Sequence, residues 1–189
     1  MTAALDLFAE RGFSTTTTQD IADRAGVTKG AFYYHFKSKD EALRIIHDEF
    51  IDRALAAQVQ ALERFETPTE QLARMAYDTT LVCIEFQKHV KVFFREQHIL
   101  SGDVRDAILA KRQLATRWYQ HAVRSGIERG EFSQEVDPDV AALGLLGMWV
   151  WTYQWYRPDG DMTPAEIARQ LTVMSMQSIG AKVPPDVLT

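Results

Sequence analysis

Residues 17–36 read TTQDIADRAGVTKGAFYYHF and contain the most informative structural pattern of the chain. The residues before Gly26 favour one short helix over about 18–25, and the glycine ends it. Thr28 can cap a second short helix that continues to about residue 34. Two short helices joined by a tight glycine turn predict a helix-turn-helix motif.

The packing of this motif follows from the spacing of its apolar residues. Ile21, Ala22 and Ala25 share one side of the first short helix, so we expect them to face the core. Val27 follows the glycine directly and is expected to fill the turn as a small buried residue. Phe32 and Phe36 are expected to belong to the same core.

The outer face of the second short helix carries small or polar residues. Such a face can approach the edges of bases in a DNA major groove. Lys29 can reach guanine O6 and N7 or a phosphate. Gly30 is a poor helix former within a short helix, which indicates close approach of another molecule. The motif therefore predicts binding of double-stranded DNA.

The rest of the chain also predicts helices. Apolar residues recur at spacings of three and four, and alternating strand patterns do not occur. We expect an all-α fold of about nine helices, with the first over about 2–11 and a long fourth helix to about Arg64. The last two long helices are expected over about 138–156 and 163–179. Capping sequences mark the helix starts at Thr17–Asp20, Ser38–Glu41, Thr67–Glu70, Asp137–Pro138 and Thr163–Glu166.

Composition limits the other possibilities. The 189 residues carry a net charge of −5, and residues 1–47 hold six basic and six acidic side chains, so charge alone does not indicate DNA binding. No apolar run reaches membrane-spanning length, and the first residues lack a signal-peptide pattern. The single cysteine, Cys83, cannot form an internal disulfide and fits a small buried residue. These features predict a cytoplasmic protein with no membrane association.

The sequence does not predict an enzyme. It contains no glycine-rich phosphate loop, no His-Glu-x-x-His cluster and no serine in a nucleophile elbow. We therefore expect no metal and no cofactor other than a small-molecule inducer.

Three segments in register resemble one known family. Residues 9–13 (AERGF), 21–27 (IADRAGV) and 30–43 (GAFYYHFKSKDEAL) are similar to the N-terminal domain of TetR-family transcriptional repressors. The resemblance implies a helix-turn-helix DNA-binding domain over residues 1–47. It also implies a helical ligand-binding and dimerisation domain over residues 48–189.

The resemblance assigns the DNA contacts and the dimer interface. The last two long helices would form the interface, and two-fold symmetry would match a palindromic operator. The implied DNA contacts are Thr18, Gln19, Thr28, Lys29, Gly30, Tyr33, Tyr34 and Lys39, of which Lys39 would hold a phosphate. The implied interface residues are Leu143, Leu146, Trp149, Val150, Tyr153, Ile167, Leu171 and Met174.

Aromatic density in the second part of the chain predicts an apolar ligand pocket. Residues 155–163 (WYRPDGDMT) resemble the matching loop of TetR-family repressors that respond to acyl-CoA thioesters. A repressor released by an acyl-CoA is the resulting hypothesis. The alternatives are a neutral aromatic or drug-like inducer, and a helical ligand-binding module that has lost DNA binding. The candidate ligand-binding residues are Tyr77, Phe86, Phe93, Phe94, Trp118, Trp151, Trp155 and Arg95, whose charge suits an anionic ligand.

Overall fold

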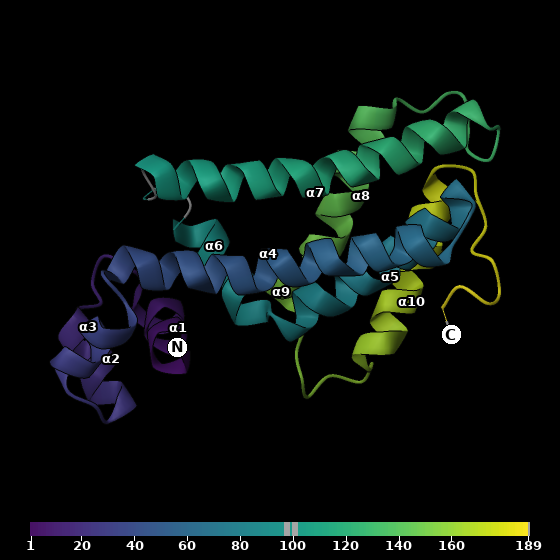
Figure 1. The fold of residues 1–189 in the computed structure, drawn as a ribbon. Coiled ribbons are helices and arrows are strands. Elements are labelled where there is room, and N and C mark those ends of the chain that lie inside the picture. Colours follow the sequence, from purple (N-terminus) through teal and green to yellow (C-terminus); the bar gives the residue numbers. More distant parts are fainter. Residues whose placement is uncertain (97–98, 100–101, 189) are drawn as a thin grey trace. The chain divides into compact units, whose positions relative to one another are not determined.

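The computed structural model describes residues 1–96, 99 and 102–188. Over these ranges it contains helices and no β-strand, which confirms the all-helical fold (Figure 1). None of the helices in this described part is long and apolar enough to cross a membrane. The helices are α1 Thr2–Arg11, α2 Thr18–Ala25, α3 Lys29–His35, α4 Lys39–Arg64, α5 Pro68–Glu85, α6 Gln87–Glu96, α7 Gly102–Glu128, α8 Pro138–Val150, α9 Thr152–Trp155 and α10 Pro164–Ser178.

The chain divides into two compact units. Unit 1 combines Met1–Ile51 with Phe86–Lys111, and unit 2 combines Asp52–Glu85 with Arg112–Thr189. Unit 1 therefore contains α6 as well as α1–α3, and both α4 and α7 contribute residues to each unit. The functional boundary near residue 47 stays a prediction.

The helices of unit 1 begin and end where the local sequence predicts. The Thr17 side chain accepts a hydrogen bond from the Asp20 amide, and the Asp20 carboxylate accepts one from the Thr17 amide, which forms the expected capping box of α2. Gly26 adopts a left-handed conformation with φ of 67°, which a glycine reaches without the cost of a Cβ. The Thr28 hydroxyl then caps α3 by accepting from the Ala31 amide at 3.2 Å.

The core of unit 1 joins these short helices to α4, α6 and α7. Phe32 is buried as expected, and Phe36 packs against the core while remaining partly exposed. Burial of these apolar side chains stabilises unit 1. The buried members include Leu7, Phe8, Phe13, Ile21, Leu43, Ile46, Phe93 and Ile108.

Two expectations for the helix-turn-helix are wrong. Ala25 is exposed and is not part of the core. Val27 is 47% exposed and does not fill the turn as a buried residue. The Val27 amide instead donates to the Ala22 carbonyl at 3.0 Å, so backbone hydrogen bonds close the turn in place of side-chain packing.

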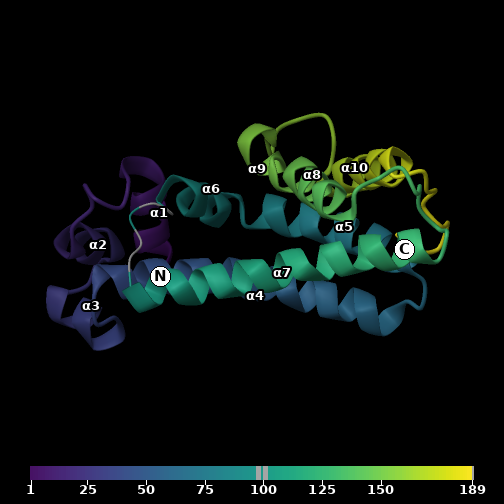
Figure 2. The ribbon, with the colours of Figure 1, turned by 90° about the horizontal axis from the view of Figure 1, so that it is seen from above.

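In unit 2, α10 packs along α5 and α8 packs against both helices (Figure 2). The Trp149 indole lies fully buried among them and donates to the Ser175 hydroxyl at 2.6 Å. Gly126 is required here, because a Cβ at this position would lie 2.2 Å from the Phe132 ring. The buried members of this core include Leu72, Met75, Tyr119, Val123, Leu145, Trp149 and Met176.

The helix expected over about 138–156 is interrupted in the structure. It ends at Val150, and the short helix α9 resumes at Thr152 after a turn at Trp151. The Thr152 hydroxyl donates to the Trp149 carbonyl at 2.8 Å at this break. A threonine hydroxyl that bonds to a nearby backbone carbonyl slightly destabilises a helix, and here this bond lies directly at the break.

Candidate functional site

The exposed face of α3 presents the residues that the sequence predicts for DNA reading. Thr28, Lys29 and Gly30 are exposed, and Tyr33 and Tyr34 are 50% and 85% exposed. A Cβ at Gly30 would meet only the Thr28 hydroxyl, at 3.7 Å, so packing within the chain does not require a glycine there. The exposed face of α3 is therefore accessible to another molecule.

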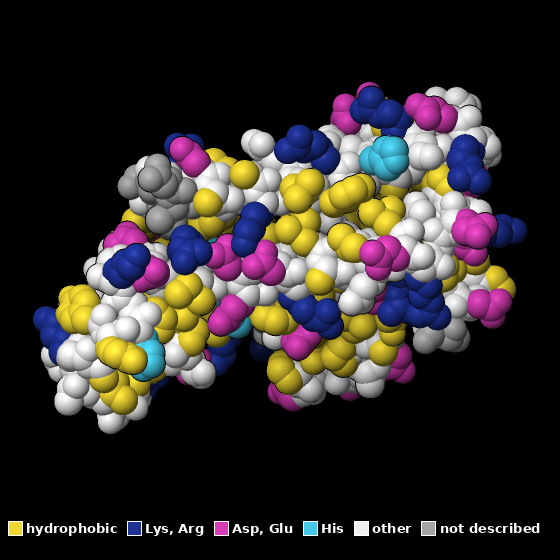
Figure 3. All heavy atoms as spheres, viewed as in Figure 1, with side chains coloured by type: hydrophobic (Ala, Val, Ile, Leu, Met, Phe, Trp, Pro, Cys, Tyr) yellow, Lys and Arg dark blue, Asp and Glu magenta, His cyan; other side chains and the backbone are white. Residues whose placement is uncertain are grey.

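Residues from α2 extend the same surface. The hydroxyls of Thr18 and Tyr33 lie 3.4 Å apart, so the structure brings these two predicted contacts together. The exposed Gln19 amide donates to Asp23 at 2.7 Å. On the face drawn in Figure 3, the part of unit 1 that holds α2 and α3 shows mainly hydrophobic and uncharged side chains.

Lys39 lies at the start of α4, and its ammonium group is held inside unit 1. Its Nζ donates to the Phe13 carbonyl at 2.7 Å and to the Thr16 carbonyl at 2.8 Å. It also lies 4.2 Å from the centre of the Phe13 ring, within cation–π range. An ammonium group has three donors, and these carbonyls use two. The expected phosphate contact of Lys39 stays a prediction.

Residues of α6 also bind the turn at Phe13. Glu96 is buried and accepts a hydrogen bond from the Phe13 amide at 3.1 Å. Arg95 donates to Glu96 at 2.7 Å and to the Ala9 carbonyl at 3.1 Å. The backbone of Phe13 is thus bound by Glu96 at its amide and by Lys39 at its carbonyl. The expected role of Arg95 beside an anionic ligand stays a prediction, and these internal partners were not predicted.

An ion pair on the surface joins α1 to α2. Arg24 lies 3.0 Å from Glu10, and the hydrogen bond from Arg24 lowers the pKa of that carboxyl. Both side chains are exposed, so water and salt screen the pair and its contribution to stability is small.

The eight candidate ligand-binding residues fall into both units. Unit 1 holds Phe86, Phe93, Phe94 and Arg95, with the Phe93 and Phe94 rings edge to face at 5.1 Å. Phe93 belongs to the buried core of that unit. Unit 2 holds Tyr77, Trp118, Trp151 and Trp155, of which the first two are half-buried and the others exposed.

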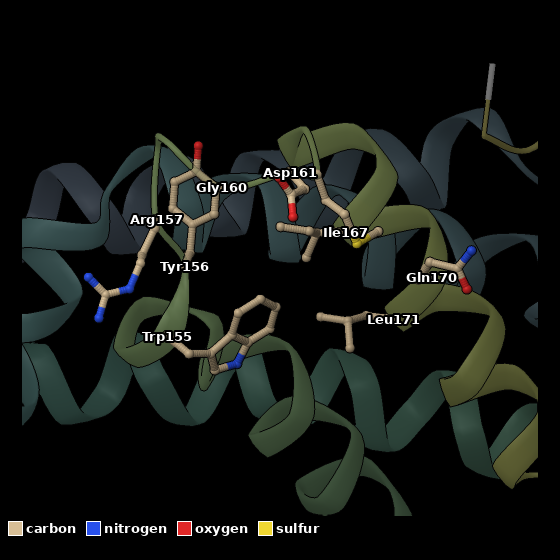
Figure 4. Close-up of a pocket in the computed structure, with 9 residues that line it drawn as sticks. Trp155, Tyr156, Arg157, Gly160, Asp161, Ile167, Gln170 and Leu171 are labelled. Carbon is tan, nitrogen blue, oxygen red and sulfur yellow. The ribbon is translucent and has the colours of Figure 1, made fainter.

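Trp155 lines an open groove of about 390 Å³ in unit 2. In Figure 4 the Trp155 and Leu171 side chains flank this groove, whereas the Arg157 side chain points away from it. The walls are chiefly aromatic and aliphatic, with few polar groups, as is usual for small-molecule sites. The other lining residues are Tyr156, Gly160, Asp161, Met162, Ile167 and Gln170.

The predicted interface residues differ in their exposure. Leu143 and Met174 are exposed, and Leu146, Val150 and Leu171 are half-buried. Tyr153 and Ile167 are nearly buried. Trp149 is fully buried and bonded to Ser175, so its side chain lies in the core of its own chain and offers no surface to a partner.

The exposed face of α8 combines the predicted interface residue Leu143 with Val140, Gly144 and Gly147, which the sequence did not lead us to predict. Val140, Leu143, Gly144, Gly147 and Trp151 are all exposed and recur at helical spacing. A Cβ at either glycine would meet nothing within 4 Å. This apolar face can therefore accept close approach by another helix, and the glycine spacing was the signal that could have identified it.

Two family models match the chain. Residues 1–44 match the tetR family of bacterial regulatory proteins, and residues 66–179 match the C-terminal domain described as tetracyclin repressor-like. The second match alone covers more than half of the chain. The chain therefore belongs to the TetR family of transcriptional regulators, which are helix-turn-helix proteins and not enzymes.

Individual relatives span nearly the whole chain. The transcriptional repressor KstR2 of Rhodococcus jostii is 30% identical over 88% of this chain and 82% of its own length. The TetR-family regulator PfmR of Thermus thermophilus is 31% identical, with a TM-score of 0.84 over 93% of this chain and 95% of that one. AibR, solved with isovaleryl coenzyme A and operator DNA, is 28% identical, with a TM-score of 0.80 over 91% and 93% of the two chains.

Proposed function

We propose that the chain is a repressor that binds a palindromic operator as a homodimer and releases it when an acyl-CoA thioester binds. Residues 1–47 would bind DNA, and residues 48–189 would bind the ligand and the second copy. Repression would take place in the cytoplasm. The observation that carries the DNA-binding role is the exposed polar face of α3, anchored from behind by the buried Phe32.

Some residues of the proposed reading helix α3 would contact bases, and others would contact phosphates. Lys29 would contact guanine, and the hydroxyls of Tyr33 and Tyr34 would contact phosphates. Gly30 would allow the backbone of α3 to approach the base edges closely. Thr18 and Gln19 would contribute from the start of α2, where the helix N-terminus favours phosphate.

The proposed dimer interface is the exposed apolar face of α8 together with the exposed side of α10. Leu143 and Met174 would be buried between the two copies, as would Val140 and Trp151. Gly144 and Gly147 would let the two α8 helices approach closely. A two-fold dimer would place its reading helices one turn of DNA apart, or a multiple of it, each turn being about 34–36 Å.

The proposed ligand combines an apolar chain with a charged end. The AibR complex supports this class, since AibR binds isovaleryl coenzyme A and operator DNA and shares the fold. The groove beside Trp155 supplies aromatic and aliphatic walls for the acyl chain. For release, the thioester must bind the DNA-incompetent state more tightly, about 10⁴-fold for a shift from 1:99 to 99:1.

Selection from a pool of random duplex DNA tests the proposed function. The wild-type protein should enrich a palindrome, and native mass spectrometry should show two copies of the chain on it. Added isovaleryl-CoA should remove the protein from the enriched duplex, with coenzyme A alone as the control. Release by neutral aromatic compounds instead would change the inducer class. Enrichment of no sequence would favour a ligand-binding module without operator binding.

A further inference from the structure

Three helices of unit 2 bring polar side chains together inside an apolar core. Gln58 of α4, Thr79 of α5 and Tyr119 of α7 are only 1%, 4% and 2% exposed. The Thr79 and Tyr119 hydroxyls lie 2.6 Å apart, and the Tyr119 ring packs against Trp149 with the ring centres 5.3 Å apart. A polar cluster at this depth lies between the helices of a bundle, where ligand sites commonly form.

The amide of Gln58 is only partly used. Its nitrogen makes a long hydrogen bond of 3.4 Å to the Ala115 carbonyl, and the amide also bonds to Tyr119. Its oxygen, Oε1, is buried and has no hydrogen-bond partner among the described residues. A buried acceptor without a donor destabilises the folded chain, so a group of this kind in a native core requires an explanation.

We propose that Gln58 Oε1 accepts a hydrogen bond from a hydroxyl group on the acyl chain of the inducer, which makes a hydroxyacyl thioester the preferred ligand. This inference rests on the proposed acyl-CoA response. The amide oxygen can only accept, so a carbonyl or a saturated chain cannot satisfy it, whereas a hydroxyl can. A site built to bond a ligand hydroxyl discriminates strongly against the analogue that lacks it.

The neighbouring groups favour binding over chemistry. Burial raises the pKa of Tyr119 to about 12, so its hydroxyl keeps its proton at neutral pH and remains a donor. Burial also raises the pKa of Cys83 to about 12. The thiol therefore stays protonated and does not attack a thioester, because the thiolate is the nucleophile.

The test compares two thioesters of equal chain length, 3-hydroxyhexanoyl-CoA and hexanoyl-CoA, by calorimetric titration of the full-length protein. The wild type should bind the hydroxylated ligand more tightly by roughly 5- to 150-fold. Gln58→Met should bind both equally. Thr80→Val is the matched control, because Thr80 is buried but its hydroxyl is already bonded to the Ala76 carbonyl of its own helix, so the preference should persist.

The outcomes separate this inference from the proposed function. Binding of both thioesters with equal affinity by the wild type would overturn the hydroxyl site and leave the acyl-CoA response intact. A preference that survives in Gln58→Met would also overturn it, since another group would then read the hydroxyl. Binding of neither thioester would overturn the proposed inducer class and the hydroxyl site together. If Gln58→Met does not fold, the relative affinity of the wild type for the two thioesters decides whether the hydroxyl site exists.

Discussion

The turn at Phe13 in unit 1 and the polar cluster around Gln58 in unit 2 satisfy their polar groups in different ways. At Phe13, Glu96 binds the backbone amide and Lys39 binds the carbonyl, so the turn is complete within the chain. At Gln58, one buried oxygen has no donor among the described residues. Unit 2 also exposes an apolar helix face on α8.

The polar groups at the Phe13 turn of unit 1 are satisfied within the chain, whereas unit 2 has a buried acceptor and an apolar surface that other molecules could cover. The contacts at Phe13 and Ala9 link the ends of α1, α4 and α6 to one turn. These contacts fix the part of unit 1 against which α2 and α3 pack. In unit 2 a spare acceptor and an exposed apolar face are costly unless something else covers them. We therefore interpret unit 1 as preformed for DNA and unit 2 as completed by a ligand and a second copy.

Glu96→Ala should have the largest effect on stability. It leaves the buried Phe13 amide without an acceptor and Arg95 without its carboxylate, and we expect a loss of about 3 kcal/mol. Urea denaturation at fixed protein concentration measures it. Glu96→Gln retains an acceptor and should lose less. The exposed Glu10→Gln is the control and should unfold with the wild type, and a Glu96→Ala curve equal to that control would contradict the role of the turn.

Gly144→Leu should weaken dimerisation about 10- to 100-fold, because the added side chain would overpack a two-fold interface in both copies. Within its own chain the new Cβ meets nothing within 4 Å, so the fold should persist. Analytical ultracentrifugation measures the dimer. Gln113→Leu adds the same side chain to an exposed position of α7 and should leave the dimer unchanged. An unaltered dimer in Gly144→Leu would place the interface elsewhere.

Lys29→Ala should cost about 1–3 kcal/mol of operator affinity and relax the sequence preference at one base pair. Lys39→Ala should instead weaken binding to all sequences about equally and lower the salt dependence. Fluorescence anisotropy on the selected and a scrambled duplex measures both. If the salt dependence of Lys39→Ala equals that of the wild type, Lys39 serves only the Phe13 turn and contacts no phosphate.

Gly30→Ala should separate stability from DNA binding. Replacing an exposed helical glycine by alanine should stabilise the chain by about 1 kcal/mol, because the unfolded backbone has less freedom to lose. The same methyl group should obstruct the approach of α3 to DNA and reduce operator affinity. Thermal unfolding and anisotropy on one preparation test this pair of effects. A stabilised variant with unchanged affinity would show that Gly30 does not lie against DNA.

The smallest effect concerns the capping box of α10. Hydrogen bonds from the Thr163 amide and hydroxyl lower the pKa of Glu166. A lowered pKa in the folded state stabilises the protein above the usual carboxyl range, and this contribution is lost as the pH falls through the folded-state value. Glu166→Gln should therefore differ from the wild type at neutral pH and converge with it in acid. Parallel thermal-midpoint curves across that range would contradict it.

Local features allowed the fold to be predicted from the sequence. Capping residues and glycines act within four residues of themselves, so Thr17, Gly26 and Thr163 set helix ends correctly. The errors arose where backbone bonds replaced side-chain packing, as at Val27. The Phe13–Glu96 bond joins residues 83 apart, and no local pattern reports it. The unpaired oxygen of Gln58 likewise depends on what three separate helices bring beside it.

The most direct test of the whole account is anisotropy of the selected duplex, titrated with protein in the presence and absence of 3-hydroxyhexanoyl-CoA. We expect dimeric binding that weakens steeply with salt and is reversed by the thioester but not by coenzyme A. Binding that the thioester leaves unchanged at saturating concentration would contradict the proposed coupling between the two units.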